Sequence, residues 1–181
     1  MQADTGELKW TYRCNGRIVN PAIAIGHRQV YFVEVHDDQY NLVALDAGSG
    51  AAAWRETHDF SQNGRALHLA YADDTIAVTG AEEKWHIQVF SARDGSLMWH
   101  SEYGFPRNGY GSDEYPPLII GNVLFTEPYA YNLRSGKRVN LKGEEDDKWR
   151  QSGGRRGCSA ASSSTTCVIW GDPYPAIYDI E

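Results

Sequence analysis

Three arginines near the C-terminal end of the chain have the chemistry to bind an anion. Arg150, Arg155 and Arg156 lie in the segment 149–158, together with three glycines. Each guanidinium can donate paired hydrogen bonds to a carboxylate or a phosphate. The acidic run 144–147 lies just upstream, so ion pairs on a solvated loop are the alternative. The segment therefore predicts either a ligand-binding site or a set of surface ion pairs.

Two cysteines, Cys158 and Cys167, lie on the two strands of one predicted hairpin, with serines 162–164 at its tip. If the turn is centred between the first two of these serines, the cysteines face each other across the ladder. A directly opposed, non-hydrogen-bonded pair has a Cα separation of about 4.5 Å, at the short end of disulfide geometry. Both a disulfide and two buried thiols agree with this pattern. The third cysteine, Cys14, is expected to be an inert small residue.

The residue types that build metal sites and active sites occur without the spacings that such sites use. The six histidines form no HxH or HExxH pattern, so a metal site would need ligands from different parts of the fold. The chain has neither a G-x-S-x-G elbow nor a phosphate loop. We therefore expect no catalytic residues and no metal ligands. Loops rich in tyrosine and proline at 110–117 and 172–175 suit contact with a protein or a carbohydrate, or packing inside the fold.

A repeated pattern organises the chain. An apolar strand ends at an Asp, a turn containing glycine follows, and a Trp lies eight residues after the Asp, as in Leu45–Trp54. The copies, aligned on the Asp position, fall at Gln2, Asp46, Ser91, Asn132 and Asp179. The steps between them are 44, 45, 41 and 47 residues. Such a period, with a glycine turn and a Trp in each unit, is typical of a β-propeller or a similar array.

Each repeat predicts four short antiparallel strands, A to D, separated by turn residues. The fold class is therefore all-β, a β-propeller of four-stranded blades with four repeats in the chain. The predicted blades are 15–57, 58–103 and 104–142, followed by strands A to C of a fourth blade at 143–181, whose strand D lies at 1–14.

The fourth blade is divided between the two ends of the chain, and this seam allows two ways of closing the ring. One chain could form four blades, with Glu7–Arg13 completing its own last sheet, or two chains could exchange this strand in an eight-bladed homodimer. Both leave no open strand edge to aggregate. Eight blades need half the angle between neighbours that four blades need, which keeps tryptophans docked between blades in contact. We therefore expect a homodimer, the commonest symmetry of soluble oligomers.

At these residues the chain resembles the pyrroloquinoline-quinone-type β-propeller repeat. The motif of that family, Leu-Asp-Ala-x-Thr-Gly-x-x-x-Trp, is matched by Leu45–Trp54 and in part by Asp4–Trp10. The resemblance implies that Trp10, Trp54 and Trp99 dock against neighbouring blades. The third repeat departs from the motif, with Asn140 at the Trp position, so Trp149 or Tyr131 is expected to hold that blade.

The resemblance to the repeat does not by itself imply a bound quinone cofactor. Quinoprotein dehydrogenases of this fold use a catalytic Asp, a calcium ion held by Glu and Asn, a Trp under the quinone and often a vicinal disulfide. This chain has no adjacent cysteines, and no Asp can be aligned with the catalytic base. We therefore expect no cofactor. Other relatives, among them the eight-bladed outer-membrane assembly lipoprotein, are scaffolds.

Composition narrows the functions further. A net charge of −7 provides no broad basic face for nucleic acid or anionic lipid. No apolar run is long enough for membrane insertion. The first repeat begins near residue 4, so we expect that the signal peptide of a secreted parent protein would lie outside this chain. The resemblance implies a periplasmic or extracellular location. It favours a non-catalytic binding or scaffold domain of a bacterial envelope or secreted protein. The expected partners are a second copy of the chain, in a homodimer, and a protein or a carbohydrate. The alternatives are the propeller of an oxidoreductase using pyrroloquinoline quinone and calcium, and a purely structural domain of a longer chain.

Overall fold

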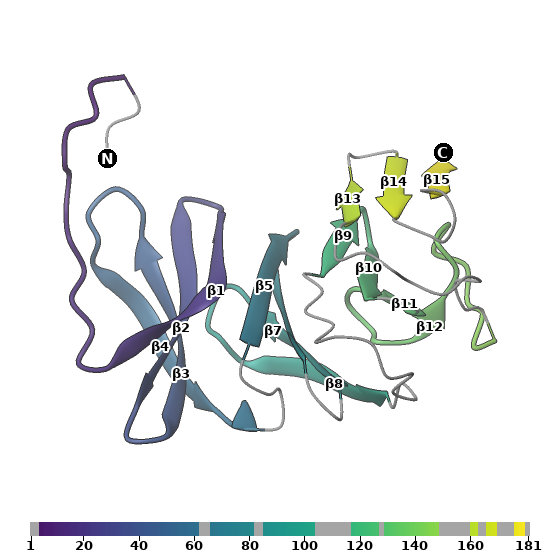
Figure 1. The fold of residues 1–181 in the computed structure, drawn as a ribbon, viewed down its shortest axis with the longest axis horizontal. Coiled ribbons are helices and arrows are strands. Elements are labelled where there is room, and N and C mark those ends of the chain that lie inside the picture. The colour runs from purple at the N-terminus through teal and green to yellow at the C-terminus, as the bar shows by residue number, and fades with distance from the viewer. Residues whose placement is uncertain are drawn as a thin grey trace.

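The prediction of an all-β chain is confirmed by a computed structural model. It describes residues 4–61, 66–81, 85–103, 117–126, 129–148, 160–162, 166–169 and 176–179. These residues form fifteen strands in four antiparallel sheets (Figure 1), and no α-helix occurs among them. No helix that could span a membrane is found in the part of the chain described.

Each sheet is a simple meander, because consecutive strands pair in chain order. The first sheet consists of β1 (Arg17–Gly26), β2 (Gln29–His36), β3 (Gln39–Asp46) and β4 (Ala52–His58). The second consists of β5 (Ala66–Ala72), β6 (Thr75–Ala81), β7 (Trp85–Ser91) and β8 (Leu97–Tyr103). The third consists of β9 (Leu118–Ile120), β10 (Val123–Thr126), β11 (Tyr129–Asn132) and β12 (Arg138–Val139). The fourth has three described strands, β13 (Ala160–Ser162), β14 (Thr166–Ile169) and β15 (Ala176–Asp179).

Local sequence explains the tight hairpins inside the sheets. Both residues of the turns His27–Arg28, Asp37–Asp38 and Asp73–Asp74 have positive φ angles, between 46° and 62°. Two such residues between antiparallel strands form the type I′ geometry, which matches the right-handed twist of the strands. Asp tolerates this left-handed conformation better than most residues.

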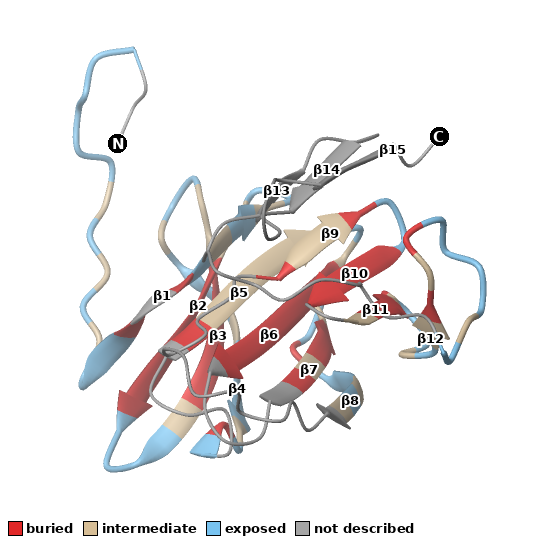
Figure 2. Ribbon diagram, turned by 45° about the vertical axis from the view of Figure 1, so that its right-hand side comes forward, coloured by how far each residue is buried: buried red, intermediate tan, exposed pale blue. Residues whose placement is uncertain are grey.

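The sheets stack face to face as blades. Their first strands, β1, β5, β9 and β13, follow one another as spatial neighbours. One apolar cluster lies between the first and second sheets and a second between the second and third. Figure 2 shows the buried residues concentrated in the central strands β2, β3, β6 and β10. These strands are buried on both faces, so they are nearly continuous apolar runs.

One expectation about the seam is wrong for the single chain. Residues Glu7–Arg13 were expected to form a strand, but the described segment 4–14 forms none, and among the described strands β15 pairs with β14 alone. In Figure 1 this segment lies beside the first sheet, whereas β15 lies at the opposite side of the molecule. A segment becomes a strand only beside a sheet edge with which it can pair. The first three sheets lie between segment 4–14 and the edge of β15. The self-closed four-bladed ring is therefore not the arrangement seen.

Candidate functional site

Each of the three tryptophans donates its indole N–H to a carbonyl of the following sheet. Trp10 Nε1 donates to the Ala47 carbonyl at 3.0 Å, and Trp54 Nε1 to the Ala92 carbonyl at 3.0 Å. Trp99 Nε1 donates to the carbonyl of Leu133 at 2.9 Å. Ala47, Ala92 and Leu133 each follow the repeat's Asp position directly. The same contact therefore recurs between segment 4–14 and the first sheet and at the two boundaries between the first three sheets.

The residues that accept these bonds are held in place by their own N–H groups. The Ala47 N–H donates to the Arg28 carbonyl at 2.8 Å, and the Ala92 N–H donates to the Asp74 carbonyl at 2.9 Å. The N–H of Leu133 donates to the Asn122 carbonyl at 2.8 Å. Each acceptor is therefore fixed to the first hairpin of its own sheet. Indole, acceptor and hairpin form one unit at each boundary.

A β-bulge turns the indoles of Trp54 and Trp99 onto the correct face. Leu45 pairs with Ala52 and Ala44 pairs with Trp54, which leaves one extra residue before the Trp. The same shift occurs before Trp99. Because strand residues alternate between faces, this extra residue decides which face carries the ring.

Glycine is required where each indole lies against the next turn. Gly50, Gly95 and Gly136 have φ angles of 74°, 77° and 71°. A Cβ at these positions would lie 2.6, 2.8 and 2.7 Å from the rings of the three tryptophans. Any side chain there would meet both a strained backbone conformation and a clash.

Asp46 stabilises the first of these turns. Its Oδ1 atom accepts hydrogen bonds from the N–H groups of Gly48 and Ser49 and from the Ser49 hydroxyl, at 2.7–3.0 Å. Hydrogen bonds from Ser49, more than any other contact, lower the pKa of the Asp46 carboxyl. Asn132 makes the equivalent bonds in the third sheet.

Asn140, at the fourth Trp position, closes a loop instead of docking. Its side-chain N–H donates to a Glu144 carboxylate oxygen at 2.8 Å, and its Oδ1 accepts from the N–H groups of Lys142 and Glu144. Tyr131 packs against Trp99, with ring centroids 5.9 Å apart, so it lies on the face that meets the second sheet. Tyr131 therefore does not replace the missing Trp at the next boundary, and Trp149 lies outside the described residues.

The segment 4–14 is anchored on the outer face of the first sheet. The Tyr12 hydroxyl donates to Glu34 Oε2 at 2.8 Å, and the Tyr12 ring meets Phe32 edge-on at 5.1 Å. Arg55 forms an ion pair with Glu34 and donates to the Tyr12 hydroxyl at 2.7 Å. Glu34 is only 4% exposed, so this pairing compensates for burying its charge.

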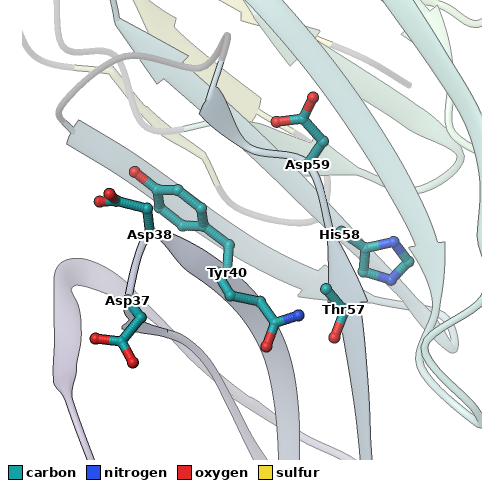
Figure 3. Close-up of a pocket in the computed structure, with 7 residues that line it drawn as sticks. Asp37, Asp38, Tyr40, Thr57, His58 and Asp59 are labelled. Atoms are coloured by element: carbon teal, nitrogen blue, oxygen red, sulfur yellow. The ribbon is translucent and has the colours of Figure 1, made fainter.

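A pocket of about 370 Å³ opens where the turn between β2 and β3 lies beside the end of β4. Its lining residues are Asp37, Asp38, Gln39, Tyr40, Thr57, His58 and Asp59. Figure 3 shows the hairpin residues Asp37, Asp38 and Tyr40 on one side and Thr57, His58 and Asp59 on the other. The His58 ring is engaged elsewhere, because Nε2 bonds with the Gly95 carbonyl at 2.9 Å. Among the described residues no group of three or more His, Cys, Asp or Glu is arranged to hold a metal. The sequence placed Asp37 and Asp38 at a hairpin tip but gave no signal for this pocket.

Arg150, Arg155, Arg156 and Cys158 lie outside the described residues, so the anion site and the disulfide stay predictions. The register of β13 and β14 differs from the one expected, since Cys167 pairs with Ser162. The turn is therefore centred two residues later than predicted. Cys14 is a free thiol that donates to the Gly16 carbonyl at 3.1 Å.

The comparisons with known proteins agree with this architecture. The family model described as "Outer membrane protein assembly factor BamB" matches residues 1–165. No curated protein sequence matches the chain. Among solved structures, BamB from Moraxella catarrhalis is similar, with a TM-score of 0.59 and 15% identity over 97% of this chain and 50% of that chain.

Two further structures share the fold. A europium-containing methanol dehydrogenase gives a TM-score of 0.50 and 19% identity over 74% of this chain and 26% of that chain. The computationally designed Ika8 protein gives a TM-score of 0.50 and 14% identity over 90% of this chain and 58% of that chain. The chain thus spans about half the length of the BamB structure and about a quarter of the length of the methanol dehydrogenase. These similarities show a propeller repeat fold of the pyrroloquinoline-quinone-like type.

Proposed function

Because the chain belongs to the family of the outer membrane protein assembly factor BamB, we propose that it is a non-catalytic β-propeller scaffold that binds proteins of the bacterial envelope. The observation that carries this proposal is the indole contact that Trp10, Trp54 and Trp99 each make with the sheet that follows. It joins successive sheets rigidly, so their hairpins and loops form a fixed surface. Preformed surfaces bind with little loss of conformational entropy.

The location that fits this role is the periplasm, with the extracellular space as the alternative. The support is the family's description as an outer membrane protein assembly factor. The acidic net charge of −7 would keep such a domain away from anionic membrane surfaces and leave it available to protein partners.

Binding to isolated assembly machinery tests the scaffold role. The purified chain would be immobilised and exposed to the outer-membrane protein assembly complex of the bacterium that encodes it. We expect saturable binding that soluble chain competes away, and none to an unrelated acidic protein of similar mass. Lack of saturable binding to any component of the complex would overturn the proposal.

The second candidate is a quinoprotein oxidoreductase, favoured by the likeness in fold to a methanol dehydrogenase. Addition of pyrroloquinoline quinone and calcium discriminates between the two functions. A scaffold should return no protein-bound chromophore after gel filtration and no dye-linked alcohol oxidation. Both signals together would favour the oxidoreductase.

We also propose that the chain works as a homodimer that completes one ring. The described part of the last sheet has three strands, whereas the other sheets have four. Exchange of one strand between two copies would complete both seam sheets.

A further inference from the structure

The pocket beside the turn between β2 and β3 is negatively charged. Carboxylates of Asp37, Asp38 and Asp59 line it, and no arginine or lysine belongs to its described lining. In Figure 3 the Tyr40 ring lies between the carboxylates of Asp38 and Asp59. A concave site lined by charges of one sign attracts groups of the opposite sign.

A second Asp-Asp turn of the chain provides a direct comparison. Asp73 and Asp74 lie between β5 and β6 with φ angles of 46° and 57°, close to the 47° and 60° of the turn beside the pocket. Arg134 reaches Asp73 at 2.5 Å, and Arg93 reaches Asp74 at 3.0 Å. Both carboxylates of this second turn are therefore neutralised by arginines of the chain itself.

The turn beside the pocket has no such arginines. Among the described residues Asp37 forms an ion pair only with its neighbour His36, at 3.5 Å, and Asp38 forms none. The side chains of His36 and Asp37 are 55% and 89% exposed, so their pairing is weak. Two turns with the same residues and the same backbone conformation thus differ in their charge, which only the turn beside the pocket leaves available to a ligand.

The walls of the pocket are held in place by the fold. Tyr40 meets the buried Phe60 ring edge-on, with centroids 6.1 Å apart. Asp59 Oδ1 accepts a hydrogen bond from the Ser61 N–H at 2.8 Å. The pairing of Tyr40 with His58 fixes the distance between the two sides of the pocket. A ligand would therefore meet a preformed site, which lowers the entropic cost of binding.

Two neutral side chains add hydrogen-bond acceptors to the carboxylates. A carbonyl oxygen can only accept, so His58 Nε2 carries the hydrogen of its 2.9 Å bond with the Gly95 carbonyl. In the neutral ring Nδ1 is then an acceptor. The Thr57 hydroxyl donates its hydrogen to Asn41 Oδ1 at 2.8 Å, so its oxygen is also left to accept. The pocket therefore suits a ligand group that donates hydrogen bonds.

We infer that this pocket binds a basic side chain, arginine or lysine, of a protein partner. Both basic groups are positively charged and have donors but no acceptor. A guanidinium can also bind a carboxylate through two parallel hydrogen bonds and stack on an aromatic ring, and Asp38 and Tyr40 offer these two contacts. The pocket volume of about 370 Å³ is at the small end of ligand sites, about 300–1,000 Å³, which suits one extended side chain.

This inference rests on the proposed scaffold function for the nature of the partner, a protein, and adds the chemistry by which one site would recognise it. An acidic or phosphorylated segment is the wrong ligand, because it would bring negative charge to carboxylates that no described arginine or lysine neutralises.

A pair of short peptides tests the site without any assembly partner. Acetyl-Gly-Arg-Gly-amide should cause saturable changes in the amide NMR signals of residues 37–40 and 57–59. The same peptide with citrulline, which is neutral and nearly the same shape, should cause none. Equal changes with both peptides, or no change at these residues with the arginine peptide, would overturn the inference.

Matched turn variants show whether the carboxylates are responsible. Asp37→Asn with Asp38→Asn should weaken binding of the arginine peptide about tenfold, and Asn tolerates the left-handed turn. Asp73→Asn with Asp74→Asn is the control, because it removes the same charge and should leave binding unchanged. Consecutive turns of a meander lie at opposite ends of its sheet and β5 lies beside β1, so the control turn is remote from the pocket. Equal affinities of the two variants would overturn the inference.

The same variants separate this inference from the scaffold function. Wild-type chain and the control variant should bind the assembly complex alike, and the variant with Asn at both pocket turn positions should bind it about tenfold more weakly. Equal binding by all three chains would overturn the inference and leave the scaffold function in place. A wild-type chain that binds the arginine peptide but not the complex would contradict only the scaffold function.

Discussion

The boundary between the first and second sheets and the end of the third sheet use equivalent parts of the repeat and differ in one residue type. At the first boundary Trp54 lies on β4, a strand of seven residues, and docks on the second sheet. In the third sheet Asn140 takes the Trp position, and β12 has only two residues. The docked indoles of Trp54 and Trp99 thus each lie on a full fourth strand of seven residues. Where the indole is absent, the polar side chain bonds to its own loop, and the strand ends early.

Removing the indole should break the first boundary and have the largest effect. Trp54→Ala removes the contact with the Ala92 carbonyl and the packing against Tyr31, 6.0 Å away between ring centroids. We expect a loss of about 3–5 kcal/mol in the free energy of unfolding, measured in urea. Leu97→Ala, at an exposed position, should change stability by about 0.5 kcal/mol or less. Equal losses of stability for both variants would show that the docked Trp54 indole does not hold the first boundary together.

A pair of glycine substitutions separates the indole contact from backbone strain. Gly95 and Gly121 both have positive φ, but a Cβ at Gly95 would lie 2.8 Å from Trp54, whereas at Gly121 nothing lies within 4 Å. Gly121→Ala should cost about 1–2 kcal/mol through conformation alone. Gly95→Ala should cost about 1–3 kcal/mol more, because the ring must move. Thermal unfolding of both variants measures the difference, and equal costs would place the strain entirely in the backbone.

Alkaline pH should weaken the first boundary through Tyr31. Burial, with smaller effects from Tyr71 and Asp74, raises the pKa of Tyr31 from 10.0 to about 12. The folded state holds the phenolic proton more tightly, so its contribution to stability is complete below pH 10 and is lost as pH rises towards 12. We expect a loss of about 1–2 kcal/mol over this interval. Tyr31→Phe should flatten the slope in denaturant unfolding from pH 9 to 12, and an unchanged slope would exclude Tyr31 as its source.

Surface ion pairs should contribute least. Arg134 of the third sheet reaches Asp73 of the second at 2.5 Å, and Arg93 reaches Asp74 inside the second sheet at 3.0 Å. Arg134→Ala and Arg93→Ala should each cost about 0.5 kcal/mol or less at low salt, and less at high salt. A large, salt-insensitive loss for Arg134→Ala alone would show that this pair, rather than the indole, joins the sheets.

The strands were the most predictable part of the fold. The first predicted blade, for instance, was expected at 15–57, and its four strands run from Arg17 to His58. Apolar runs, glycines and acidic turn pairs are local signals, and they define where a strand can begin and end. The residues of the pocket were not predictable in this way. Tyr40 and His58 are 18 positions apart in the sequence and meet because β3 and β4 pair.

The register of the last hairpin was predicted incorrectly for a related reason. The three serines at its tip allow several turn positions, and the pairing of β14 with β15 is a contact outside the hairpin that a local pattern cannot weigh. The choice of partner for Cys167 therefore depends on neighbouring strands rather than on the turn residues themselves.

The sequence alone determined the period, the all-β class, and the positions of Trp10, Trp54 and Trp99 relative to their glycines, because these depend on spacing along the chain. Tertiary structure alone decided that Asn140 closes a loop, that a buried Glu34 holds Arg55 and Tyr12 together, and that segment 4–14 lies on the first sheet unpaired. The physical reason is that a strand becomes part of a sheet only when an edge with free N–H and C=O groups lies beside it. Which edge is available depends on how the sheets stack in space.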